Sequence, residues 1–367
     1  MTAVAARPRE RGMNVAYDVA VIPGDGIGKE VVPAAIQVVD RAAELHGFRM
    51  SWTYFPWGCD HYLETGMMMP EDGLQQLAKH QAVFFGAVGH PDVPDHVSLW
   101  GLLIPMRRGF HQFANLRPCR TLPGTAGPLR LTDSGRIDLV VVRENVEGEY
   151  SEIGGRIYSG TQDETAVQES VFTRRGVERI MHYAFELARS RRGNLVAATK
   201  SNGIVHTMPF WDQVCREVAE EYADVSWRLM HVDALAAAMV LQPQRFDVVV
   251  GSNLFGDVLS EIGAAVTGSI GTAPSANIDP TRQHPSLFEP IHGSAPDIAG
   301  NGVANPVGQI WSAVMMLEHL GEAAAAHNVM AAVEEVVANP DLRTRDLGGE
   351  CGTQQVADAI TAALGSF

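Results

Sequence analysis

Short apolar runs alternate along this chain with longer segments in which apolar residues recur every three or four positions. The short runs predict strands at Tyr17–Ile22, Ala82–Val88, Ile137–Val142, Leu195–Thr199, Val225–Val232 and Phe246–Val250. The longer segments predict helices at Glu30–His46, Val97–Phe113, Phe172–Arg189, His206–Tyr222, Val307–Leu320 and Gln354–Leu364. This alternation favours βα units around a largely parallel sheet, so the predicted fold class is α/β.

Three segments follow neither pattern. Glu152–Thr165 is rich in Gly, Ser and Thr and carries Ile153 and Ile157 in alternation, which predicts a protruding hairpin. Gly268–Pro285 and Glu289–Pro306 are rich in Gly and Pro and are predicted to be loops. With 367 residues, the chain suits one large or two moderate domains and can bury a core.

The chain is acidic, with a formal net charge of -15 at pH 7 and a pI near 5.3. Nucleic acids and anionic membranes need a basic face, so we expect neither as a partner. No apolar run approaches the roughly 18 residues of a membrane span, and Met1–Asn14, expected to be an exposed tail, lacks the apolar core of a signal peptide. The four cysteines show no paired spacing that would indicate a zinc site or disulfides. We therefore expect a cytoplasmic protein whose arginines hold a small anionic substrate.

Side chains that can perform chemistry follow several of the predicted strands. Arg143, Lys200 and Asp233 each come directly after one, and Asp257 follows another through a short segment that contains glycine. In open α/β sheets, ligands bind at the carboxyl ends of the strands. We therefore expect one reactive site, with cations for carboxylates, acids for a divalent metal, and a lysine and a tyrosine for proton transfer. Its candidate residues are Arg107, Arg117, Arg143, Tyr150, Lys200, Asp233, Asp257 and Glu261.

Lysine is rare in this chain, because only three of its 28 basic residues, Lys29, Lys79 and Lys200, are lysines. Arginine does not lose its proton in a protein, whereas a partly desolvated lysine beside other cations does so near neutral pH. Lys200 is therefore the candidate base. The alternative is a strand-end lysine in a structural salt bridge.

Two acids indicate a metal site. Asp257 and Glu261 are four residues apart at a predicted helix start, so they share one face of that helix. Mg²⁺ and Mn²⁺ prefer such oxygen ligands, and the helix dipole would keep Asp257 ionised if it lies in the first turn. The alternative to a metal site is that both acids are solvated residues that cap the helix. Asp233, which follows another strand, could supply a further ligand and therefore favours the metal site.

The glycine-rich segment Gly24-Asp-Gly-Ile-Gly28 matches neither common phosphate-binding motif. Pro23 stands where a P-loop has its first glycine, and Glu30 replaces the hydroxyl residue. The segment also misses the dinucleotide pattern G-x-G-x-x-G by one position. We interpret it as a strand-to-helix turn, which is either purely structural or lies close to a ligand.

Taken in order, these segments resemble the metal-dependent β-decarboxylating dehydrogenases of 2-hydroxy acids, the isocitrate/isopropylmalate dehydrogenase-like family. The motifs that carry the resemblance are Gly24-Asp-Gly-Ile-Gly28, Arg107 with Asn115-Leu-Arg-Pro118, Val142-Arg-Glu-Asn145 through Tyr150, Thr199-Lys-Ser-Asn202, Val232-Asp233, Asn253-Leu-Phe-Gly-Asp257 and His292-Gly-Ser-Ala-Pro-Asp-Ile-Ala-Gly300. Pro94-Asp-His-Val-Ser-Leu-Trp-Gly101 and Ala273-Pro-Ser-Ala-Asn277 are most similar to the tartrate dehydrogenase and D-malate dehydrogenase branch. The resemblance covers nearly everything after Tyr17.

The resemblance implies a two-domain α/β fold that is not a Rossmann fold. Residues 1–112 and 268–367 would form a cofactor-binding domain from both chain ends, and residues 113–267 a central dimerisation and metal/substrate domain. Members are typically homodimers, and an arm at about 152–165 would clasp the partner. Each site would borrow residues of the Lys200 and Asp233 type from the neighbouring subunit.

The resemblance also assigns roles to the candidate residues. Substrate carboxylates would be bound by Arg107, Arg117 and Arg143, whose guanidinium groups can donate twice to one carboxylate. Magnesium or manganese would be held by Asp233, Asp257 and Glu261, and would lower the pKa of the substrate's C2 hydroxyl. Lys200 would accept that proton, with Asp233 also counted as catalytic. Tyr150 would protonate the carbanion that decarboxylation leaves.

NAD is the implied cofactor, with K⁺ as an accessory ion. Its contacts would come from His292, Gly293, Ser294, Ala295, Asp297, Asn305 and Asn202. Asp297 would accept hydrogen bonds from the adenosine ribose diol and repel a 2′-phosphate, which favours NAD over NADP. Without the resemblance, His292 would be interpreted as an ordinary loop histidine.

The segment before Arg107 bears on the substrate. His90–Met106 contains no Lys or Arg, so a third substrate carboxylate would lack a cation there. Trp100 would narrow the pocket toward malate or tartrate, and 3-isopropylmalate is the alternative substrate. We expect oxidation, with or without β-decarboxylation, of a small 2-hydroxy dicarboxylate such as tartrate or D-malate.

Two residues depart from the family pattern. Glu261 stands where the motif has an aspartate, and Pro105 is expected to interrupt the helix before Arg107. A different class of function is also open, because the family includes non-catalytic regulatory subunits. Such chains would lose some of the arginines, the tyrosine or the lysine, whereas this chain retains them all, which favours an enzyme.

Overall fold

The computed structural model describes residues 15–125, 127–129 and 136–366, so the expected tail Met1–Asn14 lies outside the described residues. The chain divides into two compact units. Unit 1 contains the described residues of Met1–Gln112, Arg120–Ser134 and Ala264–Phe367, and unit 2 those of Phe113–Cys119 and Gly135–Gly263. The expected central domain, residues 113–267, differs from unit 2 because it also includes residues 120–134 and 264–267.

The sheet of unit 1 has its strands in the order β2-β1-β3-β12-β11. Their bounds are Arg49–Tyr54, Ala16–Gly24, Ala82–Ala87, Ser286–Pro290 and Pro274–Ile278. All neighbours pair in parallel except β11 and β12, which are antiparallel. Every residue of β3 is buried, as its continuous apolar sequence requires for a strand covered on both faces.

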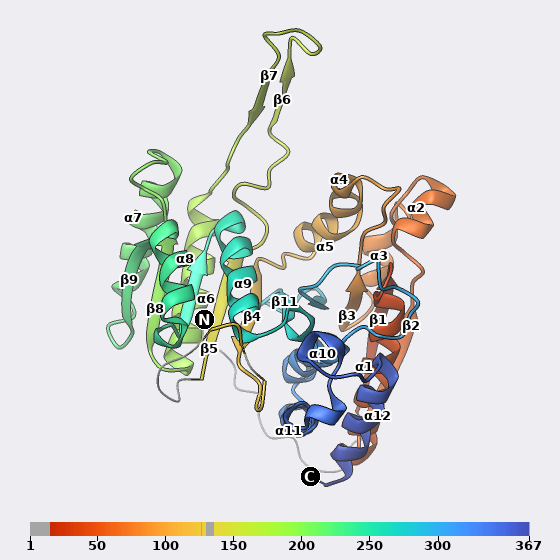
Figure 1. Ribbon diagram of the computed structural model, residues 1–367. Coiled ribbons are helices and arrows are strands. Elements are labelled where there is room, and N and C mark those ends of the chain that lie inside the picture. Colours follow the sequence, from red (N-terminus) through yellow and green to blue (C-terminus); the bar gives the residue numbers. More distant parts are fainter. Residues whose placement is uncertain (1–14, 126, 130–135, 367) are drawn as a thin grey trace. The chain divides into compact units, whose positions relative to one another are not determined.

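Four long helices of unit 1 pack against one another beside this sheet: α1 (Gly28–His46), α10 (Val307–Leu320), α11 (Ala323–Ala338) and α12 (Thr353–Ala363). Helix α1 ends at Gly47, whose φ of 75° is the left-handed conformation that glycine adopts without strain. The shorter helices α2 (Cys59–Thr65) and α3 (Gly73–Leu77) lie between β2 and β3 in the chain. Figure 1 shows α1 and α12 side by side, although they come from opposite ends of the sequence.

The helix predicted before Arg107 is continuous, and the expected interruption at Pro105 is absent. Helix α4 (Asp95–Ser98) leads into a π-helical turn, Leu99–Leu103, and then into α5 (Ile104–Gly109). Pro105 is the second residue of α5 and follows the π-helical turn, in which the hydrogen bonds span one residue more than in an α-helix. The wider π-helical turn, which precedes this proline, contains Trp100.

The sheet of unit 2 has the order β4-β5-β10-β8-β9. The bounds are Ala114–Arg120, Asp138–Glu144, Val248–Gly251, Asn194–Thr199 and Ser226–His231. The pairs β5–β10, β10–β8 and β8–β9 are parallel, as the βα alternation predicted. Together with the sheet of unit 1, these pairings confirm the α/β class.

Helices α6 (Arg174–Ser190) and α7 (Thr207–Ala219) pack together and against the unit 2 sheet, and α8 (Val232–Leu241) contacts β8 and β9. Thr173 caps α6, because its hydroxyl accepts a hydrogen bond from the Gly176 N–H. Helix α9 (Asn253–Thr267) follows β10 directly, and its first residues belong to unit 2.

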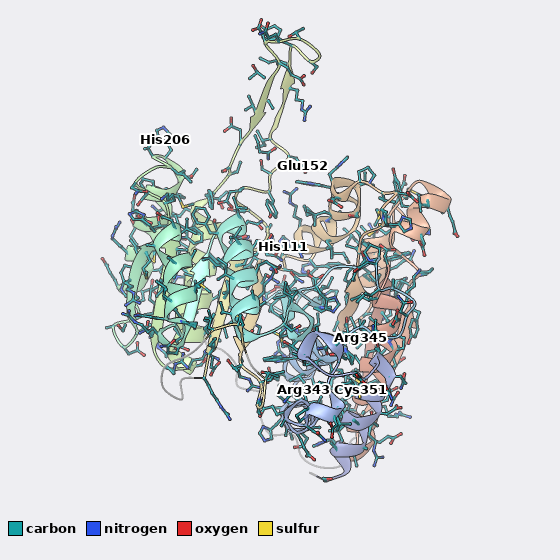
Figure 2. All side chains as sticks on the ribbon, in the orientation of Figure 1. His111, Glu152, His206, Arg343, Arg345 and Cys351 are labelled. Carbon is teal, nitrogen blue, oxygen red and sulfur yellow. The ribbon has the colours of Figure 1, made fainter. Side chains whose placement is uncertain are left out.

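The predicted hairpin is present in unit 2, although its second strand extends beyond the predicted bounds, to Gln168. Strands β6 (Gly154–Ile157) and β7 (Thr165–Gln168) pair in antiparallel orientation, and every residue in them is exposed. The hairpin projects from the rest of the unit (Figure 1), and Glu152 lies at its base (Figure 2). Its role as an arm that clasps a partner stays a prediction.

The prediction of two long loops in the final third was wrong in part. Strand β11 lies inside the first predicted loop, and β12 ends in the second. Both strands have only five residues, and prolines stand in each, so their sequences resemble turns although all ten residues are buried. Helix α11 was also missed. No described helix is long and apolar enough to cross a membrane.

Candidate active site

Asp257 is the centre of a charged cluster in unit 2. The Tyr150 hydroxyl donates to its Oδ2 at 2.9 Å. Its Oδ1 pairs with Arg117 Nη1 at 3.0 Å and also accepts from Arg143 Nη1. Four of the sequence-predicted site residues therefore meet at one carboxylate, although they come from β4, β5, the following loop and α9. Glu261 lies one turn further along α9, 3.7 Å from Arg117 Nη1.

Several contacts fix the side chain of Arg143. It lies inside β5, one residue before the strand ends, and its side chain is 2% exposed. Its Nε and Nη2 both donate to Asn253 Oδ1, at 3.0 and 2.7 Å, and its guanidinium lies 5.4 Å from the centre of the Tyr150 ring. Gly256 allows this approach, because a Cβ there would lie 2.6 Å from the Arg143 Cβ.

Arg117 is also buried and fixed by neutral partners. Its Nε donates to Asn115 Oδ1, and its Nη1 donates to Ser260 Oγ, both at 2.8 Å. Each arginine is thus oriented by an amide and also pairs with Asp257, so two fixed cations surround one carboxylate. A fixed pair of guanidinium groups suits the recognition of small anions that carry carboxylates.

Burial controls the proton affinity of two groups in this cluster. It raises the pKa of Tyr150, and the negative charge of Asp257 raises it further, so the hydroxyl stays protonated and available as a donor. Burial also raises the pKa of Glu261, against the lowering effect of the Arg117 charge. A further cation beside Glu261 would favour its ionised form.

The structure confirms that Asp257 and Glu261 share one face of a helix, since both contact Arg117. It corrects the position of Asp257, because α9 begins at Asn253 and Asp257 therefore lies beyond the first turn. The dipole argument for its ionisation is thus weaker than expected, and the two arginines supply the stabilising charge instead. Among the described residues, no group of three or more His, Cys, Asp or Glu side chains is arranged to hold a metal.

Lys200 and Asp233 form a pair of their own. Lys200 Nζ donates to Asp233 Oδ1 at 2.8 Å, and this hydrogen bond lowers the pKa of the Asp233 carboxyl. Lys200 follows β8 as predicted, whereas Asp233 lies in the first turn of α8. About two thirds of the Asp233 side chain is exposed, so this acid has free surface toward solvent.

Sequence reasoning missed the residues that fasten the loop between Arg143 and Tyr150. Glu149 accepts from Ser252 Oγ at 2.7 Å and from the Leu254 N–H at 3.0 Å. Asn253 Nδ2 donates to the Glu147 carbonyl at 3.0 Å. The available signal was the spacing of acids in Glu144-Asn-Val-Glu-Gly-Glu-Tyr150, together with the Ser252-Asn253 pair at a helix start.

Arg107 belongs to unit 1 and has different partners. It is buried, and its Nη2 donates to Glu289 Oε1 at 3.0 Å. Asn277 Nδ2 donates to the same oxygen at 2.7 Å, and the Arg107 Nε has no hydrogen-bond partner among the described residues. Trp100, from the π-helical turn, lies under the guanidinium of Arg108, whose Cζ is 5.0 Å from the ring centre.

Unit 1 also contains a cavity of about 800 Å³. Three of the predicted cofactor residues line it, His292, Ala295 and Asn305. Ile27 lines it as well, so the Gly24–Gly28 turn does approach this cavity. Burial lowers the pKa of His292, so its ring is neutral near neutral pH. A cavity of this size, with apolar walls and a few polar groups, suits a nucleotide-sized ligand.

The other predicted cofactor residues do not line the cavity. The Ser294 carbonyl accepts from the Ile27 N–H at 2.9 Å, Gly293 and Asp297 are exposed, and Asn202 belongs to unit 2. The carboxylate in the cavity wall is Asp346, which sequence reasoning missed. It accepts from Asn305 Nδ2 at 2.9 Å and from Ser269 Oγ at 2.5 Å.

The chain is similar to known proteins over nearly its whole length. The chain is 53% identical over 350 residues to a probable tartrate dehydrogenase/decarboxylase of Bacillus subtilis, covering 95% of this chain and 98% of the relative. It is 55% identical over 350 residues to the D-malate dehydrogenase [decarboxylating] of Escherichia coli, covering 93% and 97%. The crystal structure of isocitrate dehydrogenase from Methylococcus capsulatus matches with a TM-score of 0.86 at 36% identity, covering 95% of this chain and 99% of that one.

The sequence model of the isocitrate/isopropylmalate dehydrogenase family matches residues 18–360, which include every predicted site residue. Relatives at this level of identity are named as decarboxylating dehydrogenases. This chain belongs to the isocitrate/isopropylmalate dehydrogenase family.

Proposed function

We propose that this protein is a NAD- and divalent-metal-dependent dehydrogenase that oxidises a small 2-hydroxy dicarboxylate such as tartrate or D-malate, with or without β-decarboxylation. The observation that carries the proposal is the meeting of Arg117, Arg143 and Tyr150 at Asp257. The relatives named as tartrate and D-malate dehydrogenases support the choice of substrate class.

The donor set partly fits a hard divalent cation. Asp257 and Glu261 offer carboxylate oxygens on one face of α9, and the raised pKa of Glu261 indicates a buried acid that a cation would stabilise. A third carboxylate is needed, and we assign it to Asp233 of a second copy of this chain, because Asp233 is exposed beside Lys200. When bound, the metal lowers the pKa of the substrate's C2 hydroxyl.

Each of the candidate residues would then have its own role in the reaction. The guanidinium groups of Arg117 and Arg143, and Arg107 from unit 1, bind substrate carboxylates. Lys200 accepts the C2 hydroxyl proton during oxidation, and Tyr150 donates its proton to the carbon that loses the β-carboxylate. The raised pKa of Tyr150 keeps that proton in place until it is used.

We assign the dinucleotide to the cavity of unit 1, where it would supply the hydride acceptor. His292 and Asn305 offer ring and amide groups to the adenosine. Asp297 lies in the same loop between the lining residues Ala295 and Ile298, and its charge disfavours a 2′-phosphate. The smaller substrates are favoured by Trp100, whose position Arg108 stabilises.

The test is an assay of the purified protein for NADH formation with D-malate, the tartrate isomers, 3-isopropylmalate and isocitrate. Each acid is offered with NAD or NADP, in Mn²⁺, in Mg²⁺ and after chelation. We expect turnover of D-malate or tartrate with NAD and metal, and none after chelation. Preference for 3-isopropylmalate would replace the substrate assignment, and binding without turnover of any acid would indicate a regulatory subunit instead.

A further inference from the structure

Glu144 is a buried acid to which the proposed reaction gives no role. It is the last residue of β5, directly after Arg143, and is 1% exposed. Its Oε1 accepts from two successive backbone amides, Val146 N–H at 2.9 Å and Glu147 N–H at 3.0 Å. Its Oε2 is buried and has no hydrogen-bond partner among the described residues. A carboxylate that binds two successive amides fixes the course of the backbone at that point.

The Glu144 carboxylate pairs with the guanidinium of Arg179. Arg179 reaches from α6 and donates from Nη2 to Glu144 Oε1 at 3.3 Å. The guanidinium of Arg179 also lies 4.5 Å from the centre of the Phe113 ring. The strand β10, which pairs with β5, carries only apolar residues and glycine. The other neighbour of β5, β4, carries Arg117, which pairs with Asp257. The charges that act on Glu144 are those of Arg179 and, from the loop itself, Glu147.

The backbone that Glu144 fixes leads directly to the reactive residues. The Glu147 carbonyl accepts from Asn253, and Asn253 in turn accepts both hydrogen bonds that orient Arg143. Three residues after Glu147 stands Tyr150, whose hydroxyl contacts Asp257. A shift of the amides at 146 and 147 would therefore move both the carboxylate-binding arginine and the proton donor.

We propose that Glu144 is a positioning residue, whose ionised carboxylate holds the Val146 and Glu147 amides and so places Tyr150 and Arg143 for the reaction. This inference rests on the function proposed above, and it adds a residue that positions the groups of that site. A carboxylate accepts hydrogen bonds about twice as strongly as a neutral acid. The ionised form is therefore the one that keeps the loop in place.

The charge state of Glu144 changes in the neutral range. Burial raises the pKa of Glu144 to about 7, against the lowering effects of Arg179 and the two amides, while Glu147 raises it slightly further. The carboxyl is therefore ionised above about pH 7 and protonated below it. The free Oε2 is the oxygen that takes the proton, so Oε1 would still face the amides, as the weaker neutral acceptor.

The test compares kcat and KM across the neutral pH range in the parent and three variants. Glu144→Gln keeps the shape and removes the charge. Arg179→Met removes the cation that favours ionisation. Asp247→Asn is the matched control, because Asp247 is also 1% exposed and pairs with Arg191 Nε at 2.8 Å, but it precedes β10, at the opposite end of the strands from Glu144.

We expect kcat of the parent to fall as the pH drops through about 7. This fall is the acid limb of the pH profile. Glu144→Gln should lower kcat at high pH by about tenfold to hundredfold with little change in KM, and its kcat should no longer show the acid limb. Arg179→Met should move the limb to higher pH, and Asp247→Asn should leave it in place. An acid limb that persists in Glu144→Gln, with kcat within about twofold of the parent at high pH, would overturn the inference.

Hydrogen exchange separates this inference from the proposed function. If no acid in the panel is turned over by the parent, the proposed function fails, while protection of the 145–150 amides remains measurable. We expect that protection to weaken below about pH 7 in the parent and to lose its pH dependence in Glu144→Gln. The same protection at all pH values in the parent would refute the positioning role, whether or not any variant folds.

Discussion

The Tyr150 hydroxyl donates to Asp257 Oδ2 at 2.9 Å, so the proposed proton donor is held by the proposed metal ligand. One carboxylate therefore links the two functions of the unit 2 site. Its other oxygen pairs with both Arg117 and Arg143. The two arginines proposed to bind the substrate carboxylates therefore also depend on Asp257. Changes at any of these residues will consequently alter more than one kinetic parameter.

Tyr150→Phe tests the proton donor. The ring, and with it the contact to the Arg143 guanidinium, is retained, whereas the hydroxyl that donates to Asp257 is lost. We expect kcat to fall by about 10²-fold or more, as for other acid–base groups. The measurement is steady-state NADH formation with D-malate. Tyr222→Phe, which removes a hydroxyl bonded to His182, is the matched control and should turn over like the parent.

Lys200→Arg tests the base. Arginine keeps the charge beside Asp233 but does not release its proton. We expect kcat to fall by about 10²–10⁴-fold while the substrate still binds, which is measured as NADH formation together with a binding titration. Lys79→Arg serves as the control. Turnover close to that of the parent in Lys200→Arg would remove this lysine from the mechanism.

Asp297→Lys tests the choice of dinucleotide. The parent should prefer NAD strongly, and the variant should bind NAD more weakly and admit some NADP, because a cation now faces the position of the 2′-phosphate. The ratio of kcat/KM for NAD and NADP is the measurement. Asp358→Lys makes the same charge change on α12 and should not alter the ratio.

Should the ratio stay unchanged in Asp297→Lys as well, the discriminating carboxylate is not Asp297. Asp346 would then be the residue to change, because it lies in the cavity wall itself. Equal use of NAD and NADP by the parent would contradict the assignment of either carboxylate.

The two acids on α9 test the metal site. Asp257→Asn removes a full negative ligand from a hard cation, so metal-dependent activity should nearly vanish. Glu261→Asp shortens the side chain by one methylene, and we expect it to tighten the binding of Mg²⁺ or Mn²⁺. Metal titrations of NADH formation give the apparent affinities. An unchanged or weaker affinity in Glu261→Asp would mean that the surroundings have adapted to glutamate, and full activity in Asp257→Asn would exclude the site.

The sequence predicted the unit 2 cluster better than it predicted the cofactor cavity, for a physical reason. Arg143, Asp257 and Glu261 are placed by a regular strand and a regular helix, whose periodicity is visible in one chain. Asp346 lies in a 3-10 helix of only three residues, Arg345–Leu347, and contacts Ser269 from 77 positions away. No local pattern specifies such a contact.

The loop anchors were missed for a related reason. Glu144 and Glu149 bind backbone amides, and an acid in a loop sequence gives no sign of which amide it will meet. The Pro105 prediction failed because a π-helical turn lies directly before the proline and the helix continues through it, which the propensity of a single residue does not show.

The pairing of β3 with β12 has a consequence for synthesis of the chain. β3 is apolar and wholly buried, yet the strand that covers this edge emerges roughly 200 residues later. At a translation rate of about 5–20 residues per second, the edge of Ala82–Ala87 stays unpaired for roughly 10–40 seconds. An unpaired apolar edge is a template for aggregation. Nascent chains stalled between β3 and β12 should therefore depend on ribosome-associated chaperones, whereas the completed protein should not.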